Sequence, residues 1–442
     1  MHLGAFLYGV GHHLAAWRDP QVDPGAATSI DELQRWARLA EAAKFDAIFF
    51  ADNVGMATDN PDALAKNALP YPFDPLLVQA ALSAVTSRIG LVATVSTSYL
   101  PPYHLARKFA TLDHLSRGRS GWNLVTSGSQ FEARSFGLSQ QTAHSERYER
   151  AHEYVKVVKG LWDTWQDDAW THDKAVNEFF DTKKLHPLAH DGQFYSVHGG
   201  LQAPRPIQGY PVLVQAGSSE DGQDLAAATA EVVFTAQQSV EGARAFYDGL
   251  KSRAPRFGRQ ASDIKILPGI SPFVGRSEQE AQEKYEQLQA RIDPAIGLSL
   301  LSKMVGTADL GKYPLDGPFP QNLPRTEGWQ SRQALFTELA AKENLTIRKL
   351  YERVASGRGH WTLVGTASSI ADQLEHWFKS GAADGFNILA PTLPFGLQDF
   401  VTQVIPELQR RGLFRTEYQG STLREHLGLA RPAHPFFQTH TR

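Results

Sequence analysis

The segment 216–220, Ala-Gly-Ser-Ser-Glu, has the composition of an anion-binding turn. It follows an apolar run that predicts a buried strand, turns on glycine and precedes a helical pattern. Backbone N–H groups at a helix N-terminus, together with the hydroxyls of Ser218 and Ser219, would suit a phosphate. The alternative is that one of these serines only caps the helix, and the segment by itself does not decide between the two.

His144 and Tyr148 are four residues apart in a second helical pattern. This spacing places both side chains on one face of a helix, where they could reach a phosphate or a hydroxyl-bearing chain of a ligand. The alternative is a solvated helix start with no ligand.

His12 and His13 follow the first apolar run of the chain. Because adjacent residues of an extended chain point in opposite directions, we expect one ring to face a site and the other to face away. A histidine in the site could donate a proton near pH 7. We predict no metal, because the pair lacks an HExxH pattern or a dense carboxylate cluster and the chain has no cysteine. Asp52 follows the second apolar run and is either a hydrogen-bond acceptor in the site or a helix cap.

Short apolar runs alternate with amphipathic helical patterns, which predicts parallel βαβ units. The fold class we expect is α/β, a (β/α)₈ TIM-type barrel, and the alternative is an open doubly wound sheet, which is disfavoured because no GxGxxG follows the first run. The expected strands are residues 2–8, 46–51, 89–97, 121–126, 211–216, 232–236, 264–273 and 385–390. The expected helices are residues 30–44, 75–86, 103–115, 145–165, 221–230 and 240–254.

Polar residues lie on or just after five consecutive predicted strands, and in a barrel of this type the carboxyl ends of the strands meet at one mouth. These residues are His12 and His13, Asp52, Thr97 and Ser98, Asn123, and Ser218 and Ser219. Their convergence predicts a single site at that end of the barrel.

The 442 residues carry a net charge of −3, so no basic field favours nucleic acid. We found no signal-peptide pattern and no membrane-length apolar run, and expect a cytoplasmic protein. We expect one domain over residues 1–442, with insertions at about 167–204 and 294–325 and a C-terminal tail at about 420–442. Each insertion looks too short for its own core. We expect a lid or a substrate wall, and the alternative is a subunit-interface arm or mere decoration.

The sequence resembles the bacterial-luciferase-like flavin monooxygenases, and most closely the branch that contains nitrilotriacetate, long-chain alkane and dibenzothiophene-sulfone monooxygenases. The matching segments span nearly the whole chain in order: residues 11–18, 96–102, 109–119, 121–127, 144–148, 384–387, 406–412 and 422–429. The resemblance is specific for the branch and not for the substrate.

The resemblance implies a two-component enzyme that uses O₂ and reduced FMN, FMNH₂, from a separate NAD(P)H:flavin reductase to oxygenate a small organic substrate, as a homodimer or homotetramer. It implies FMN contacts at Asp52, Thr97 or Ser98, Asn123, His144, Tyr148, Ser218 and Ser219. His12 or His13, with Asn123, would lie at the reacting part of the flavin. The alternatives are a deazaflavin-dependent oxidoreductase, a metal-dependent barrel hydrolase and a non-catalytic flavin-binding protein.

Overall fold

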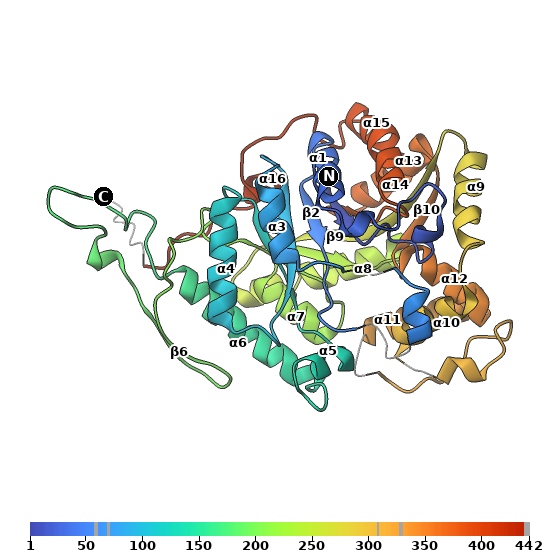
Figure 1. Cartoon of the computed structure of the whole chain (residues 1–442), viewed down its shortest axis with the longest axis horizontal. Helices are drawn as coiled ribbons and strands as arrows, with labels where there is room; N and C mark the ends of the chain where they lie inside the picture. Colours follow the sequence, from blue (N-terminus) through green and yellow to red (C-terminus); the bar gives the residue numbers. More distant parts are fainter. Residues whose placement is uncertain (57–60, 69–70, 307–308, 327–329, 437–442) are drawn as a thin grey trace.

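The computed structural model describes residues 1–56, 61–68, 71–306, 309–326 and 330–436. Within these ranges eight parallel strands close into a barrel surrounded by helices, which confirms the predicted (β/α)₈ fold (Figure 1). Strand β8 pairs with β9, and β11 pairs with β1, so the sheet has no free edge at its seam. The barrel strands are β1 (His2–Leu7), β2 (Ala47–Phe50), β3 (Gly90–Ser96), β4 (Ser120–Val125), β7 (Val212–Gln215), β8 (Val232–Thr235), β9 (Lys265–Gly275) and β11 (Gly385–Ile388).

Both faces of the barrel strands are buried, as the apolar runs predicted. In β1, Phe6 points inward and joins Phe49, Val214 and Phe234 in the cluster that fills the barrel. The neighbouring Ala5 points outward, into a cluster that lies between the strands and the outer helices. This two-residue alternation decides which strand residues can reach a site inside the mouth.

The outer layer consists of helices that pack their apolar faces on the strands. They include the six predicted helices, within three residues at every end: α1 (Ile30–Ala42), α3 (Pro75–Ser83), α4 (Pro102–Leu115), α6 (His144–Trp162), α7 (Glu220–Thr229) and α8 (Val240–Lys251). Two further helices, α9 (Glu278–Gln289) and α13 (Ala367–Lys379), were not predicted. Between them runs an extra parallel strand, β10 (Trp361–Thr366), which pairs with the second half of β9 outside the barrel.

The second insertion is longer than the expected 294–325. It contains α10 (Pro294–Val305), and the chain continues through α11 (Gln330–Glu343) and α12 (Ile347–Gly357) before β10 begins. Leu301, Phe336 and Val354 come from these three helices and belong to one apolar cluster, which also includes Leu14 from the turn after β1. The two helices beyond residue 325 supply much of this cluster, so residues 294–325 do not form it by themselves.

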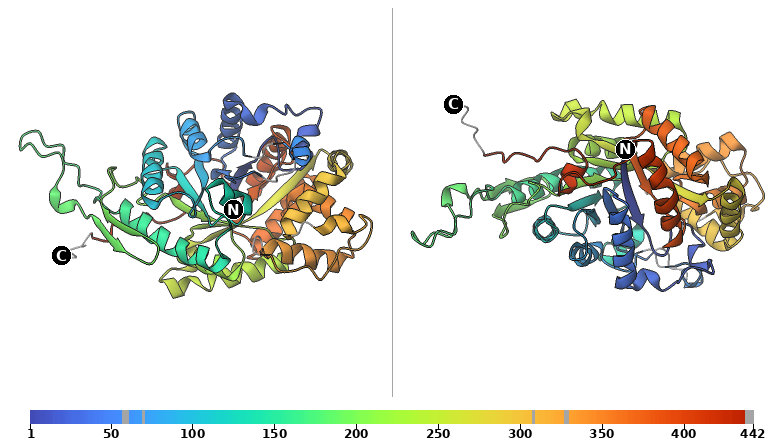
Figure 2. Two further views of the ribbon diagram at one scale, coloured as in Figure 1. Left: turned by 60° about the horizontal axis from the view of Figure 1, so that its bottom comes forward. Right: turned by 90° about the horizontal axis from the view of Figure 1, so that it is seen from above.

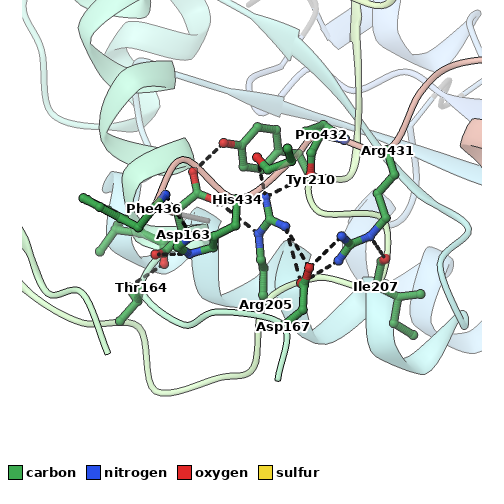
Figure 3. A network of polar contacts seen from close by, with 12 residues as sticks. Asp163, Thr164, Asp167, Arg205, Ile207, Tyr210, Arg431, Pro432, His434 and Phe436 are labelled. Atoms are coloured by element: carbon green, nitrogen blue, oxygen red, sulfur yellow. Dashed lines mark hydrogen bonds and ion pairs between the residues drawn. The ribbon is translucent and has the colours of Figure 1, made fainter. Parts of the chain in front are cut away.

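The first insertion forms an arm that projects from the side of the barrel and carries the hairpin β5 (Leu188–Asp191) and β6 (Ser196–Gly199) (Figure 2). The base of the arm is joined to the C-terminal tail by a polar network (Figure 3). In this network Arg205 Nε donates to Asp163 Oδ1 at 3.0 Å, and Arg431 Nη2 donates to Asp167 Oδ1 at 2.6 Å. Upstream in the tail, helix α16 (Leu423–His426) places Leu423 in the cluster that fills the barrel, so the tail packs on the barrel itself.

The described residues form neither an apolar helix of membrane length nor a cluster of metal ligands. None of their helices has the length and apolar character needed to cross a membrane. None of their histidine and carboxylate side chains gather in threes as a metal site would need.

Candidate active site

A cavity of about 1390 Å³ opens at the carboxyl ends of the barrel strands. One part of its wall comes from the loops that follow β1, β2, β4, β7 and β8, and another part comes from α10, α11 and the end of α12. Ligand pockets of single small molecules usually measure about 300–1,000 Å³, so this cavity has room for two. Six predicted site residues line it: His12, Asp52, Asn123, His144, Tyr148 and Ser218.

The turn after β1 brings His12 into the cavity. Gly11 makes this turn with a φ of 144°, and a Cβ atom on it would lie 2.3 Å from the carbonyl oxygen of Pro391. The His12 ring lies 5.3 Å from the ring of Phe6 and 5.0 Å from that of Tyr8, and neither ring nitrogen has a hydrogen-bond partner among the described residues. Burial, and then the charge of Arg358, lower the pKa of His12 well below its usual range. His12 is therefore neutral at pH 7 and has one donor and one acceptor nitrogen to offer.

His13 does not line the cavity. Its Nδ1 accepts a hydrogen bond from the Ala15 N–H at 3.1 Å, and its Nε2 lies 3.3 Å from Gln289 Oε1 on α9. Burial lowers the pKa of His13 to about 4. The structure thus separates the two rings as expected, with His12 at the cavity and His13 outside its lining.

Asn123 in β4 faces the cavity beside a residue that the sequence analysis missed. Its Nδ2 donates to Thr94 Oγ1 at 2.8 Å, and Thr94 Oγ1 donates to the carbonyl of Phe50 at 2.7 Å. The Asn123 Oδ1 atom is buried and has no partner. Thr94 could have been found from the alternation along β3, because it is two residues after the inward-facing Val92.

Thr97 and Ser98 lie beyond the end of β3 and do not line the cavity. The Thr97 hydroxyl points to the carbonyl of Val125 at 3.4 Å, and the Ser98 hydroxyl donates to that of Thr126 at 2.7 Å. The geometry therefore gives no support to a ligand contact at either residue, because both hydroxyls tie the chain after β3 to the chain after β4.

Asp52 lies at the cavity wall just beyond β2 and accepts a hydrogen bond from the Asn53 N–H at 2.8 Å. Burial raises the pKa of Asp52 to about 7, and the nearby carboxylates of Asp74 and Glu132 act in the same direction. This carboxyl group therefore changes its charge close to neutral pH.

The two serines of the Gly-Ser-Ser turn have different environments. Ser219 is the N-cap of α7 and accepts a hydrogen bond from the Gly222 N–H at 3.2 Å, so its hydroxyl does what the capping alternative described. Ser218 lines the cavity, and its hydroxyl lies 3.3 Å from that of Thr235. His144 and Tyr148 stand across from this turn, with ring centroids 4.8 Å apart, and His144 Nδ1 lies 3.0 Å from Asp221 Oδ2. A smaller recess of about 550 Å³ adjoins this end of the cavity and includes Ser219.

A further histidine, His360, and the arginines Arg332 and Arg358 lie in the cavity wall and were not predicted. His360, in the turn before β10, stacks on Phe234 with centroids 4.7 Å apart, and its Nε2 lies 3.0 Å from Arg332 Nη2. Arg332 belongs to α11 and Arg358 follows α12. No sequence signal marked these residues, because only the folding of the long insertion brings them to the mouth of the barrel.

The sequence of this chain matches the model of the luciferase-like monooxygenase family over residues 11–384. The fold, the cavity at the strand ends and this match together place the chain in that family, and it is a monooxygenase.

Among its relatives, an N-acetyl-S-(2-succino)cysteine monooxygenase of Bacillus subtilis is 47% identical over 98% of each chain. Component A of a nitrilotriacetate monooxygenase from Aminobacter aminovorans is 46% identical over 98% of this chain and 97% of the relative, which confirms the predicted branch. A solved structure, of a riboflavin lyase with modified FMN and riboflavin, superposes with a TM-score of 0.89 at 30% identity, over 98% of this chain and 97% of the other.

Proposed function

We propose that this chain is the oxygenase component of a two-component system, which uses O₂ and reduced FMN from a separate NAD(P)H:flavin reductase to oxygenate a small organic substrate. Reduced FMN supplies the electrons that activate O₂, and the protein binds, orients and shields the reactants. The observation that carries the proposal is a set of buried polar atoms without partners at the mouth of the barrel. They include both ring nitrogens of His12, Asn123 Oδ1 and Gln215 Oε1.

These atoms fit the polar edge of a flavin. A buried donor or acceptor without a partner is costly, and each of these atoms belongs to a residue that lines the cavity. We assign the FMN contacts to Asp52, Thr94, Asn123, His144, Tyr148 and Ser218, with His12 toward the reacting part of the ring. The riboflavin lyase structure, which holds a modified FMN on the same fold, supports FMN as the cofactor.

The roles of the chain's own side chains follow from their environments. Neutral His12 can donate one hydrogen bond and accept another near the reacting atoms. Phe6, Phe49 and Phe234 line the floor of the cavity and restrict water there, which favours coupling of reduced flavin to product over release of H₂O₂. Ser218, His144 and Tyr148 lie together at the α7 end and are our candidates for the phosphate.

The test is turnover with purified protein, FMN, NADH and an added flavin reductase, with ¹⁸O₂ as the oxidant. The substrate panel contains N-acetyl-S-(2-succino)cysteine, nitrilotriacetate, dibenzothiophene sulfone and a long-chain alkane. We expect ¹⁸O in the product only when both the reductase and FMN are present, and no NADH oxidation by the chain alone. NADH oxidation by the pure chain, or turnover without O₂, would contradict the proposal.

A further inference from the structure

Two arginines in the cavity wall have no carboxylate partner within the part of the chain that the structure describes. Arg358 Nε donates to the carbonyl of His12 at 3.2 Å, and its guanidinium lies 4.6 Å from the centre of the Tyr8 ring. Arg332 Nη2 lies 3.0 Å from His360 Nε2, and Arg332 Nη1 is buried with no hydrogen-bond partner among the described residues. A buried guanidinium with an unpaired N–H is unfavourable, because nothing compensates for the loss of water around the charge.

The charges of these two arginines shift the pKa values of neighbouring side chains. Burial and the charges of Arg332 and Arg358 lower the pKa values of His12 and His360 well below the usual range. Burial also lowers the pKa of Arg332 to about 10. This region of the cavity is therefore positive and remains so at neutral pH.

Three of the acidic side chains that line the cavity lie near the end of β2, and the fourth, Glu338, is exposed on α11. Glu132 accepts hydrogen bonds from the Ser127 hydroxyl and the Ser129 N–H, both at 3.2 Å, and Asp74 caps α3. Asp52 is close enough to these two carboxylates for them to raise its pKa. The cavity thus has an acidic region around the end of β2 and a basic region at α11 and the end of α12.

The backbone at Arg358 gives an independent observation. Arg358 is the C-cap of α12 and has a φ of 50°, a left-handed conformation in which glycine is usual. An arginine here costs conformational free energy, and non-glycine residues held in this region cluster at functional sites.

We propose that Arg332 and Arg358 form a subsite for a carboxylate, so that the substrate is a small organic acid with at least one ionised carboxyl group. A guanidinium binds a carboxylate through paired N–H donors, and the water-restricted surroundings strengthen this bond. The inference uses the proposed function only for the reaction that such an acid would undergo. The phosphate of FMN is the other anion that could occupy the subsite.

The experiment measures binding without O₂ or a reductase, so failure of oxygenation would leave its result intact. Succinate, iminodiacetate and citrate are titrated calorimetrically into the protein with saturating oxidised FMN, and their methyl esters serve as neutral counterparts. The same titrations are made with Arg332→Gln, Arg358→Gln and the matched control Arg276→Gln, whose arginine is exposed at the far end of β9. FMN and riboflavin affinities are measured for every variant.

We expect at least one acid to bind saturably and its ester at least about tenfold more weakly. Each cavity variant should weaken the acid about 10- to 100-fold, as for loss of a charge-assisted contact. Affinities for the ester and for both flavins should stay within about twofold, and the control should match the wild type. If a glutamine variant does not fold, Arg332→Lys or Arg358→Lys keeps the charge without the planar fork and should give an intermediate loss.

Three results would overturn the proposal. The first is that no acid binds the wild type or that acid and ester bind equally. The second is that the cavity variants bind the acid as well as the control does. The third is that they lose affinity for FMN and not for riboflavin, which would assign the arginines to the cofactor's phosphate.

Discussion

The different surroundings of His12 and His13 predict that the same substitution will have opposite effects at the two positions. His12→Phe keeps a ring against Phe6 and Tyr8 and removes two nitrogens that have no partner. No hydrogen bond is lost, so the free energy of unfolding should change by less than about 1 kcal/mol, as for a near-isosteric swap.

His13→Phe, by contrast, leaves the Ala15 N–H and the Gln289 side chain without their partner. A typical hydrogen bond contributes about 0.5–1.5 kcal/mol, so the two together predict a loss of about 1–3 kcal/mol. Because His13 does not line the cavity, its loss should leave the reaction unchanged at a temperature where the variant is folded.

The effect on the reaction should be reversed. Loss of one well-placed hydrogen-bonding group at a reacting centre reduces rates about 10²–10³-fold. We therefore expect His12→Phe to bind FMN normally and to release H₂O₂ in place of product. The assay measures product and H₂O₂ per reduced FMN beside urea denaturation of both variants. The reasoning is refuted if His12→Phe keeps wild-type coupling, or if His13→Phe uncouples the reaction while it is fully folded.

Three further predictions concern other parts of the structure. Ser218→Ala should weaken the binding of FMN more than that of riboflavin. Ser219→Ala should leave both affinities unchanged and cost about 1 kcal/mol of stability, because it removes an N-cap. Flavin titrations and melting curves distinguish the two variants, and equal losses for FMN and riboflavin in Ser218→Ala would remove that serine from the phosphate site. Asp52 has a pKa of about 7 in the folded chain and about 3.9 when unfolded, so its contribution to stability is present at low pH and is lost as the pH rises through 7. The melting temperature of Asp52→Asn should therefore rise relative to that of the wild type between pH 5 and pH 8. A difference that stays constant with pH would contradict the shift. Arg424 is buried and donates to both carboxylate oxygens of Glu231 at 2.6 and 2.9 Å, so Arg424→Met should lower the free energy of unfolding in urea by about 3–5 kcal/mol. Arg431 is half-exposed, so Arg431→Met should lower it by at most about 1 kcal/mol. Similar losses would show that the tail is not anchored at Arg424.

The barrel could be predicted because its strands are apolar on both faces, a signal that survives in the sequence alone. Strand β10 carried a weaker signal, since Trp361 and Thr362 are half-buried at the outer edge of the sheet. The amphipathic spacing of Ile347, Leu350 and Val354 did mark α12, and reading it would have extended the second insertion to its true length.

The site could be predicted only where a residue's place along a strand decides its direction. Asn123 follows this rule, and so does Thr94, which was missed although it lies on β3. His12 lies in the turn after β1, so its direction is set by that turn and not by its place along a strand. The direction of Thr97 and Ser98 could not be predicted, because both lie beyond the end of β3. Arg332, Arg358 and His360 reach the cavity through packing among α10, α11 and α12, and such tertiary contacts leave no local pattern in the sequence.

Strand β9 has 11 residues, and its second half pairs with β10 outside the barrel. Helices α10, α11 and α12 (residues 294–357) lie between α9 and β10 in the chain. Because α9 and β10 both pack beside β9, the two ends of this three-helix segment lie beside one strand. The three-helix segment can therefore be replaced by that of a relative through two neighbouring junctions, without a break in the barrel. A chimaera that receives residues 294–357 of a relative would change the wall bearing Arg332 and Arg358 and keep the turn bearing Ser218, so that substrate preference could diverge while the cofactor stays the same.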